Sequence, residues 1–284
     1  MSQISYENST TLTAEEKEQN LRLLMREMQK VLVAYSGGVD SSYLALIASQ
    51  ELEQNAVCLT GLSPSVSQKQ REEAARIAAD FNFNFQTVET DEMKNPLYQA
   101  NPTNRCYHCK TELYGKLHII AEANKIEFVL DGANTDDVGD YRPGRQAATE
   151  KSVRSPLIEV GLSKSEIREL SKKLRLPTWS QPSSPCLSSR IAYGVPVTIE
   201  RLSKIERGEE IVRRAGFREF RVRVHDELAR IEIAPGEMER ALDINVTKEL
   251  AEKFRKLGFK YVALDLDGYR SGAMNEVLEV RNEK

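Results

Sequence analysis

A short polar loop between a buried strand and a helix constrains this chain more than any other feature. Ser36-Gly37-Gly38-Val39-Asp40-Ser41-Ser42 follows the apolar run 31–35 and precedes an apolar helical pattern over 43–48. The sharp turn favours glycine, because glycine adopts positive φ at little cost and lets backbone N–H groups approach an anion closely. The positive end of the new helix points at the same place. The pattern therefore predicts a phosphate-binding turn.

This loop is not a Walker A loop, because it contains no lysine and does not end in Gly-Lys-Ser/Thr. Over all its positions it resembles the PP-loop of ATP pyrophosphatases. The resemblance implies a site that holds the pyrophosphate of ATP, cleaves between the α- and β-phosphates and leaves AMP on a substrate oxygen. The residues implied to bind ATP are Ala34, Ser36, Gly37, Gly38, Asp40, Ser41, Ser42, Gly132, Asn134 and Lys164.

Two of these interpretations have simpler alternatives. Asp40 is interpreted as a catalytic organiser of Mg²⁺ and the phosphates, but an acid in a first helical turn is also favoured by the helix dipole. Residues 131–137 follow a later strand and form either a second wall of the nucleotide site or a helix cap. Lys164 contacts either the pyrophosphate or solvent at a helix surface.

Apolar strand patterns and helical patterns alternate through the first two thirds of the chain. This alternation predicts an α/β fold in which helices flank a parallel sheet, with ligands at the carboxyl ends of the strands. A Pro- and Ser-rich stretch over 177–190 then indicates a boundary. We expect an N-terminal tail or short helix over 1–19, an ATP pyrophosphatase domain over 20–182, and a smaller α+β domain over 183–284 for substrate binding or oligomerisation.

Composition narrows the classes of protein that fit. The 284 residues are 40% hydrophobic, contain 40 basic and 43 acidic residues, and include no apolar run of membrane-spanning length. The polar N-terminus does not resemble a secretory signal. We therefore expect a cytoplasmic protein with no membrane partner. Because no sustained basic stripe is present, we expect no nucleic-acid partner either.

The cysteines suggest sulfur or metal chemistry. Cys106 and Cys109 form a C-x-x-C pair, and Cys186 lies in the Pro- and Ser-rich loop. Cys58 lies in an apolar strand and is predicted to be a core residue. If the first three converge, they could bind zinc with an additional ligand, form a redox arrangement, or hold a [4Fe-4S] cluster with one iron open. The residues alone leave these alternatives open.

Taken together, the motifs resemble the LarE-type ATP-dependent sulfur transferases over nearly the whole chain. The most specific segments are 36–42, 131–137, 141–144, 153–157, 185–190 and 268–272. The resemblance implies that Cys186 delivers sulfur. Some members of the family have only the cysteine that matches Cys186 and sacrifice its sulfur. Because Cys106 and Cys109 are also present here, the resemblance implies the other branch, in which all three cysteines bind a [4Fe-4S] cluster.

The same resemblance implies the reaction and its partners. ATP with Mg²⁺ would adenylate a carboxylate of pyridinium-3,5-biscarboxylate mononucleotide, and a sulfide source would then yield the thiocarboxylate used in nickel-pincer nucleotide synthesis. A homo-oligomer is also implied. Guanidinium groups suit a substrate with a phosphate and two carboxylates. The implied substrate contacts are Arg190, Arg221, Arg223 and Arg270, although a solvated strand face would explain Arg221 and Arg223 equally well.

Three other functions remain open at this point. A tRNA thiolase of the same fold would also use ATP and three cysteines, but it needs a basic surface that this composition does not suggest. An amide-forming ligase similar to NAD synthetase would have no use for the three cysteines. A nucleotide-binding module that senses redox state or metals would not turn over ATP.

Overall fold

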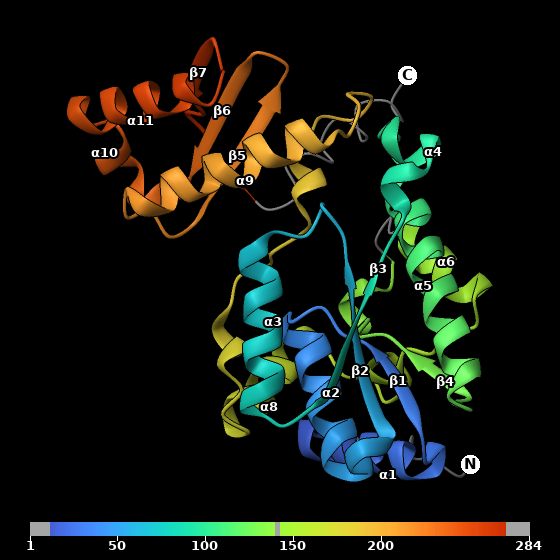
Figure 1. The fold of residues 1–284 in the computed structure, drawn as a ribbon. Coiled ribbons are helices and arrows are strands. Elements are labelled where there is room, and N and C mark those ends of the chain that lie inside the picture. Colours follow the sequence, from blue (N-terminus) through green and yellow to red (C-terminus); the bar gives the residue numbers. More distant parts are fainter. Residues whose placement is uncertain (1–11, 140–142, 271–284) are drawn as a thin grey trace, which may run out of the picture. The chain divides into compact units, whose positions relative to one another are not determined.

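The computed structural model describes residues 12–139 and 143–270 (Figure 1). The strands are β1 (Val31–Ala34), β2 (Ala56–Leu62), β3 (Asn84–Glu89), β4 (Phe128–Leu130), β5 (Phe220–His225), β6 (Leu228–Ile233) and β7 (Tyr261–Leu264). The helices are α1 (Ala14–Met28), α2 (Val39–Leu52), α3 (Gln68–Asp80), α4 (Pro96–Gln99), α5 (Arg105–Ala123), α6 (Pro143–Glu150), α7 (Pro156–Glu159), α8 (Lys164–Lys173), α9 (Ile199–Arg214), α10 (Met238–Ala241) and α11 (Ile244–Lys256).

Contacts divide the chain into two compact units, and neither is one continuous stretch of sequence. The first unit comprises Met1–Gly61, Lys69–Glu89 and Leu113–Ser183, and the second comprises Leu62–Gln68, Thr90–Glu112 and Ser184–Lys284. The domain bounds expected from the sequence remain predictions.

The first unit is built on a sheet with strand order β3-β2-β1-β4. β1 pairs in parallel with β2 and with β4, so Val31 lies beside Ala56 on one side and beside Phe128 on the other. Such a central strand is covered on both faces, which explains why Val31 and Val33 are fully buried. The expected α/β fold with a parallel sheet flanked by helices is confirmed.

Helix α2 packs into the same core and begins directly after the polar loop. Its side chains at Tyr43, Leu44 and Ile47 are fully buried, so almost no face of this helix meets solvent. A helix buried all round is fixed tightly relative to the sheet. The loop between β1 and α2 therefore has a rigid element on each side.

The second unit contains a sheet of order β5-β6-β7, in which β6 pairs antiparallel with β5 and parallel with β7. Val222 on β5 and Phe254 on α11 are fully buried in its core. Gly208 on α9 permits this packing, because a Cβ there would lie 3.2 Å from Val222 and 3.1 Å from Phe254. The expected α+β arrangement is thus present in this unit.

Two helix starts matter for the sequence motifs. Helix α1 begins at Ala14, inside the segment expected to be a tail or short helix, and a capping box between Thr13 and Glu16 stabilises its start. Helix α5 begins at Arg105, so the C-x-x-C pair lies on its first turns. Residues 1–11 lie outside the described residues. Within residues 12–139 and 143–270, no helix is both long and apolar enough to cross a membrane.

Candidate functional site

The loop between β1 and α2 has the geometry of an anion-binding turn. Gly37 has φ +76°, and a Cβ there would lie 2.8 Å from the Cβ of Ala74, so neither the backbone angle nor the space tolerates a side chain. Gly38 is the N-cap of α2. The Ser41 hydroxyl accepts from the Ser36 backbone N–H at 3.2 Å and lies 3.0 Å from the Ser36 hydroxyl. Two hydroxyls and the N-terminus of a buried helix therefore share one turn, directly after Ala34 at the end of β1.

The segment after β4 passes directly against this turn. A Cβ on Gly132 would lie 2.9 Å from the backbone nitrogen of Ser41, so only glycine allows this approach. Asn134 caps the following short helix by accepting from the Asp136 backbone N–H at 2.9 Å, and the Asn134 N–H donates to Asp137. The capping interpretation of this segment is confirmed. Its role as a wall of the nucleotide site stays a prediction, to which the close approach of Gly132 gives support.

Asp40 and Lys164 form an ion pair beside the loop. The Lys164 Nζ lies 2.5 Å from the Asp40 Oδ2, although 124 residues separate them in sequence. The Asp40 Oδ1 is buried and has no hydrogen-bond partner. Burial raises the pKa of Asp40, while Lys164 acts to lower it. An unpartnered carboxylate oxygen next to an anion-binding turn suits a Mg²⁺ ion that is shared with phosphate.

Cys106, Cys109 and Cys186 all belong to the second unit. Cys106 and Cys109 lie on α5, and Cys186 is the N-cap of the 3₁₀ helix η5 (Leu187–Arg190). Cys58 is instead fully buried on β2 in the first unit, as expected for a core residue. The predicted convergence therefore brings together cysteines from two distant parts of the sequence within one unit.

The pKa of two of these thiols is raised. Burial, with Cys186 next in importance, raises the pKa of Cys109 to about 12, and the same two causes raise the pKa of Cys106. Among the described residues, no three His, Cys, Asp or Glu side chains form a group that could hold a single metal ion. The zinc and [4Fe-4S] alternatives both stay predictions; in a cluster, each cysteine would bind a different iron atom.

A buried triangle of hydroxyl groups fastens η5 to the rest of the second unit. The Tyr98 hydroxyl lies 2.6 Å from the Ser65 hydroxyl and 2.7 Å from the Ser188 hydroxyl, and the two serine hydroxyls are 2.9 Å apart. The backbone N–H of Leu187 also donates to the Ser65 carbonyl at 2.7 Å. The two residues after Cys186 are therefore tied to two earlier segments. Ser65 and Tyr98 were not predicted from the sequence, because neither lies in a recognisable motif.

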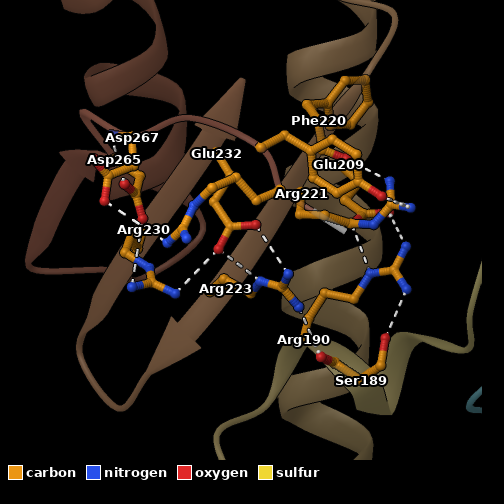
Figure 2. A network of polar contacts seen from close by, with 12 residues as sticks. Ser189, Arg190, Glu209, Phe220, Arg221, Arg223, Arg230, Glu232, Asp265 and Asp267 are labelled. Carbon is orange, nitrogen blue, oxygen red and sulfur yellow. Dashed lines mark hydrogen bonds and ion pairs between the residues drawn. The ribbon is translucent and has the colours of Figure 1, made fainter. Parts of the chain in front are cut away.

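Two of the arginines expected to contact substrate, Arg190 and Arg223, also donate to the backbone of the loop that contains Cys186. Figure 2 shows both beside Ser189, and their contact with substrate stays a prediction. Arg190 is 3% exposed, donates to the Cys186 carbonyl at 3.0 Å and pairs with Glu209 at 2.9 Å. Arg223 is 6% exposed and donates to the Ser189 carbonyl at 2.9 Å. Each guanidinium joins the backbone of the loop to a neighbouring element.

Glu232 is the carboxylate at the centre of this network. It accepts from the Arg223 Nε and Nη2, both at 2.9 Å, and from the Arg230 Nη2 at 3.0 Å (Figure 2). Glu232 is 1% exposed, so these charge-assisted bonds are shielded from water. Neither Glu232 nor Glu209 was predicted from the sequence. Glu232 lies opposite Arg221 in the strand register but pairs with Arg223, and Glu209 lies on α9.

Arg221 and Arg270 have different surroundings. The Arg221 guanidinium lies 4.7 Å over the ring of Tyr269 and donates to the Tyr269 hydroxyl at 3.3 Å. Burial, together with Arg190, lowers the pKa of Arg221. Arg270 lies 3.7 Å from Asp267. Arg221, Tyr269 and Arg270 thus place two cations and an aromatic ring close together in the second unit. Residues 141, 142, 271 and 272 of the predicted motifs lie outside the described residues.

Comparisons with known proteins place these observations in a family. The family model for NAD synthase matches residues 15–114, which include the phosphate-binding loop. A protein of Lactiplantibacillus plantarum, pyridinium-3,5-bisthiocarboxylic acid mononucleotide synthase, is 33% identical over 92% of this chain and 95% of its own length. This chain belongs to the LarE family. An uncharacterized protein of Synechocystis is 46% identical over 93% of this chain and 98% of its own length. The sequence similarity to LarE therefore spans both compact units.

Proposed function

We propose that this LarE-family protein is an ATP-dependent sulfur transferase that converts a carboxylate of a pyridinium biscarboxylate mononucleotide into a thiocarboxylate. The observation that carries the sulfur chemistry is the gathering of Cys106, Cys109 and Cys186 in one compact unit. The loop between β1 and α2 supports the use of ATP. The relative from Lactiplantibacillus plantarum, named as a synthase of the bisthiocarboxylic acid mononucleotide, supports this substrate class.

The first step activates the carboxylate. Oxide is a poor leaving group, so a substrate carboxylate oxygen attacks the α-phosphorus of ATP and pyrophosphate leaves. The N–H groups of the turn at Gly37 and Gly38, with the Ser36 and Ser41 hydroxyls, would hold the phosphates. Asp40 would bind Mg²⁺ through its unpartnered Oδ1, and Lys164 would then exchange its carboxylate partner for a phosphate oxygen.

The second step transfers sulfur. A sulfur nucleophile attacks the acyl carbon of the adenylate, the bond from that carbon to the bridging oxygen breaks, and AMP leaves with that oxygen. Cys106, Cys109 and Cys186 would hold a [4Fe-4S] cluster, which supplies one iron position open to sulfide. The donor set fits such a cluster, because three thiols lie in one unit and a buried guanidinium at Arg105 acts on Cys106 and Cys186.

Substrate recognition would fall chiefly to Arg221 and Arg270. Arg190 and Arg223 form ion pairs with Glu209 and Glu232, whereas Arg221 stacks on Tyr269. The pKa of Arg221 is lowered by burial and by Arg190. A substrate phosphate beside Arg221 would relieve that unfavourable burial of charge. We also expect a homo-oligomer in the cytoplasm and an external sulfide source.

One assay tests the proposal directly. The protein, purified and reconstituted with iron and sulfide without oxygen, is incubated with ATP, Mg²⁺, sulfide and pyridinium-3,5-biscarboxylic acid mononucleotide. We expect AMP, pyrophosphate and a product in which sulfur replaces oxygen. Asp40→Asn should lose AMP formation, whereas the matched control Asp80→Asn, at an exposed surface ion pair, should not. Cys186→Ser should lose thiolation. If wild-type protein forms no AMP with this substrate, the proposal is wrong.

The same assay separates the other candidate functions. A sacrificial mechanism would yield one equivalent of product and a protein that has lost one sulfur by mass, and it would survive Cys106→Ala. Because the NAD synthase model matches the first part of the chain, ammonia is tested in place of sulfide, and an amide product would favour a ligase. Sulfur incorporation into tRNA would favour a tRNA thiolase.

A further inference from the structure

Three buried arginines converge on the loop that contains Cys186. Arg190, Arg223 and Arg105 are 3%, 6% and 4% exposed, and they donate to backbone carbonyls at Cys186, Ser189 and Ser188 respectively. A buried guanidinium that bonds a backbone carbonyl fixes that carbonyl more firmly than a neutral donor would. All three therefore hold the position of this loop.

Arg105 also connects the loop to the start of α5. Its Nη1 donates to the Ser188 carbonyl at 2.9 Å and to the Asn101 side-chain oxygen at 2.5 Å. Asn101 is fully buried and donates through its amide to the carbonyls of Ala192 at 2.8 Å and Val195 at 2.9 Å. Arg105 immediately precedes Cys106. One guanidinium thus joins the first turn of the C-x-x-C helix to the residues that follow Cys186.

The charge of Arg105 is balanced differently from that of the other two. Arg190 pairs with Glu209 and Arg223 pairs with Glu232. Within residues 12–139 and 143–270, Arg105 forms no ion pair with a carboxylate, and the ionisable groups that act on it are Cys186, Cys106 and two tyrosines. A buried cation without an anionic partner is costly. The bonds from Arg105 to the Ser188 carbonyl and the Asn101 side chain are therefore the contacts that compensate for its burial.

We propose that Arg105 is a positioning residue for sulfur transfer, which holds the Cys186 loop against the start of α5. Its importance for catalysis rests on the proposed function, but its effect on the loop does not. That effect can therefore be measured in the protein without cluster or substrate.

Three variants separate position from charge. Arg105→Gln removes the charge and the double bonding to Asn101 and Ser188. Arg105→Lys keeps the charge but loses the planar fork. Arg201→Gln is the matched control, because Arg201 lies in the same unit and bonds a loop carbonyl, at Pro196, and a side-chain oxygen, at Asp226.

The first measurement is amide hydrogen exchange over residues 187–191. Exchange there should accelerate about tenfold in Arg105→Gln, because a hydrogen bond from a charged donor to the loop is lost, while β5 and β6 stay protected. The second is the ratio of thiocarboxylate to AMP formed by the reconstituted enzyme in the assay described above. That ratio should fall about tenfold in Arg105→Gln while AMP formation stays within about threefold of wild type, because Arg105 lies in the second unit and the loop between β1 and α2 lies in the first.

Each outcome decides a part of the proposal. Unchanged exchange over 187–191 in Arg105→Gln would overturn the positioning role, and an unchanged ratio of thiocarboxylate to AMP in that variant would overturn its importance for sulfur transfer. Equal effects from Arg201→Gln would show general destabilisation and would also overturn it. If Arg105→Gln does not fold, Arg105→Lys must still accelerate exchange over 187–191. Failure of the wild-type protein to transfer sulfur would reject the proposed function and leave the exchange result standing.

Discussion

Replacing Glu232 tests whether the arginine network stabilises the second unit. In Glu232→Gln the charge is lost, while Arg223 and Arg230 still surround the side chain. Three bonds at 2.9, 2.9 and 3.0 Å end on this carboxylate, and both Glu232 and Arg223 are nearly inaccessible to water. Removing one partner of a buried ion pair typically costs about 3–5 kcal/mol, because the remaining charge stays buried without compensation. We therefore expect Glu232→Gln to lower the free energy of unfolding of the second unit by an amount in that range.

The assay must report on the correct unit. The only tryptophan, Trp179, belongs to the first unit, so its fluorescence would follow the wrong transition. Amide hydrogen exchange of β5 and β6 under native conditions measures the opening of the second unit instead. The double variant Arg223→Met, Glu232→Leu should be less destabilised than Glu232→Gln, since it leaves no unpaired charge from this pair. A loss below about 1 kcal/mol in Glu232→Gln would refute the reasoning, because that is the range of an exposed pair.

Three further predictions concern the two candidate sites. Gly132→Ala should cost about 1–3 kcal/mol of stability and raise KM for ATP, because its Cβ would lie 2.9 Å from the Ser41 nitrogen; urea unfolding and AMP-release kinetics check this. Arg221→Gln should raise KM for the mononucleotide about tenfold or more, measured in the thiolation assay, while KM for ATP stays unchanged. Burial raises the pKa of Cys109 to about 12, so above about pH 8.5 the folded apoprotein keeps a proton that the unfolded chain has lost. Its free energy of unfolding should therefore fall as the pH rises from about 8.5 towards 12, and urea midpoints should show a shallower fall in Cys109→Ser.

Local patterns in the sequence were enough to predict the parallel sheet of the first unit. Alternation of strands and helices indicated that sheet, and Gly37 and Gly38 marked the turn, because the constraint at such a turn acts on neighbouring residues. The Ser-x-x-Glu pattern at Ser163 and Glu166 likewise matches the capping box at the start of α8. These features depend on contacts within a few residues, which a sequence displays directly.

The surroundings of the cysteines could not be predicted in the same way. Arg190 and Arg223 were interpreted as substrate contacts because guanidinium groups suit phosphate, but whether a carboxylate already engages them depends on tertiary packing. Ser65 meets Ser188 across 123 residues, and no local pattern records that pairing. The substrate roles of the predicted site residues remain predictions, to be tested by the assays above.

The discontinuous second unit has a consequence for the order of folding during synthesis. Its hydroxyl triangle joins Ser65 and Tyr98 to Ser188, so the two earlier segments emerge from the ribosome long before their partner exists. Contacts between residues so far apart form late, because closing a long loop costs entropy before any contact compensates for it. We therefore expect the environment of the three cysteines to be the last part of the molecule to form. A nascent chain that ends before residue 188 should leave Cys109 more open to alkylation than in the complete chain, even when the first unit already resists proteolysis.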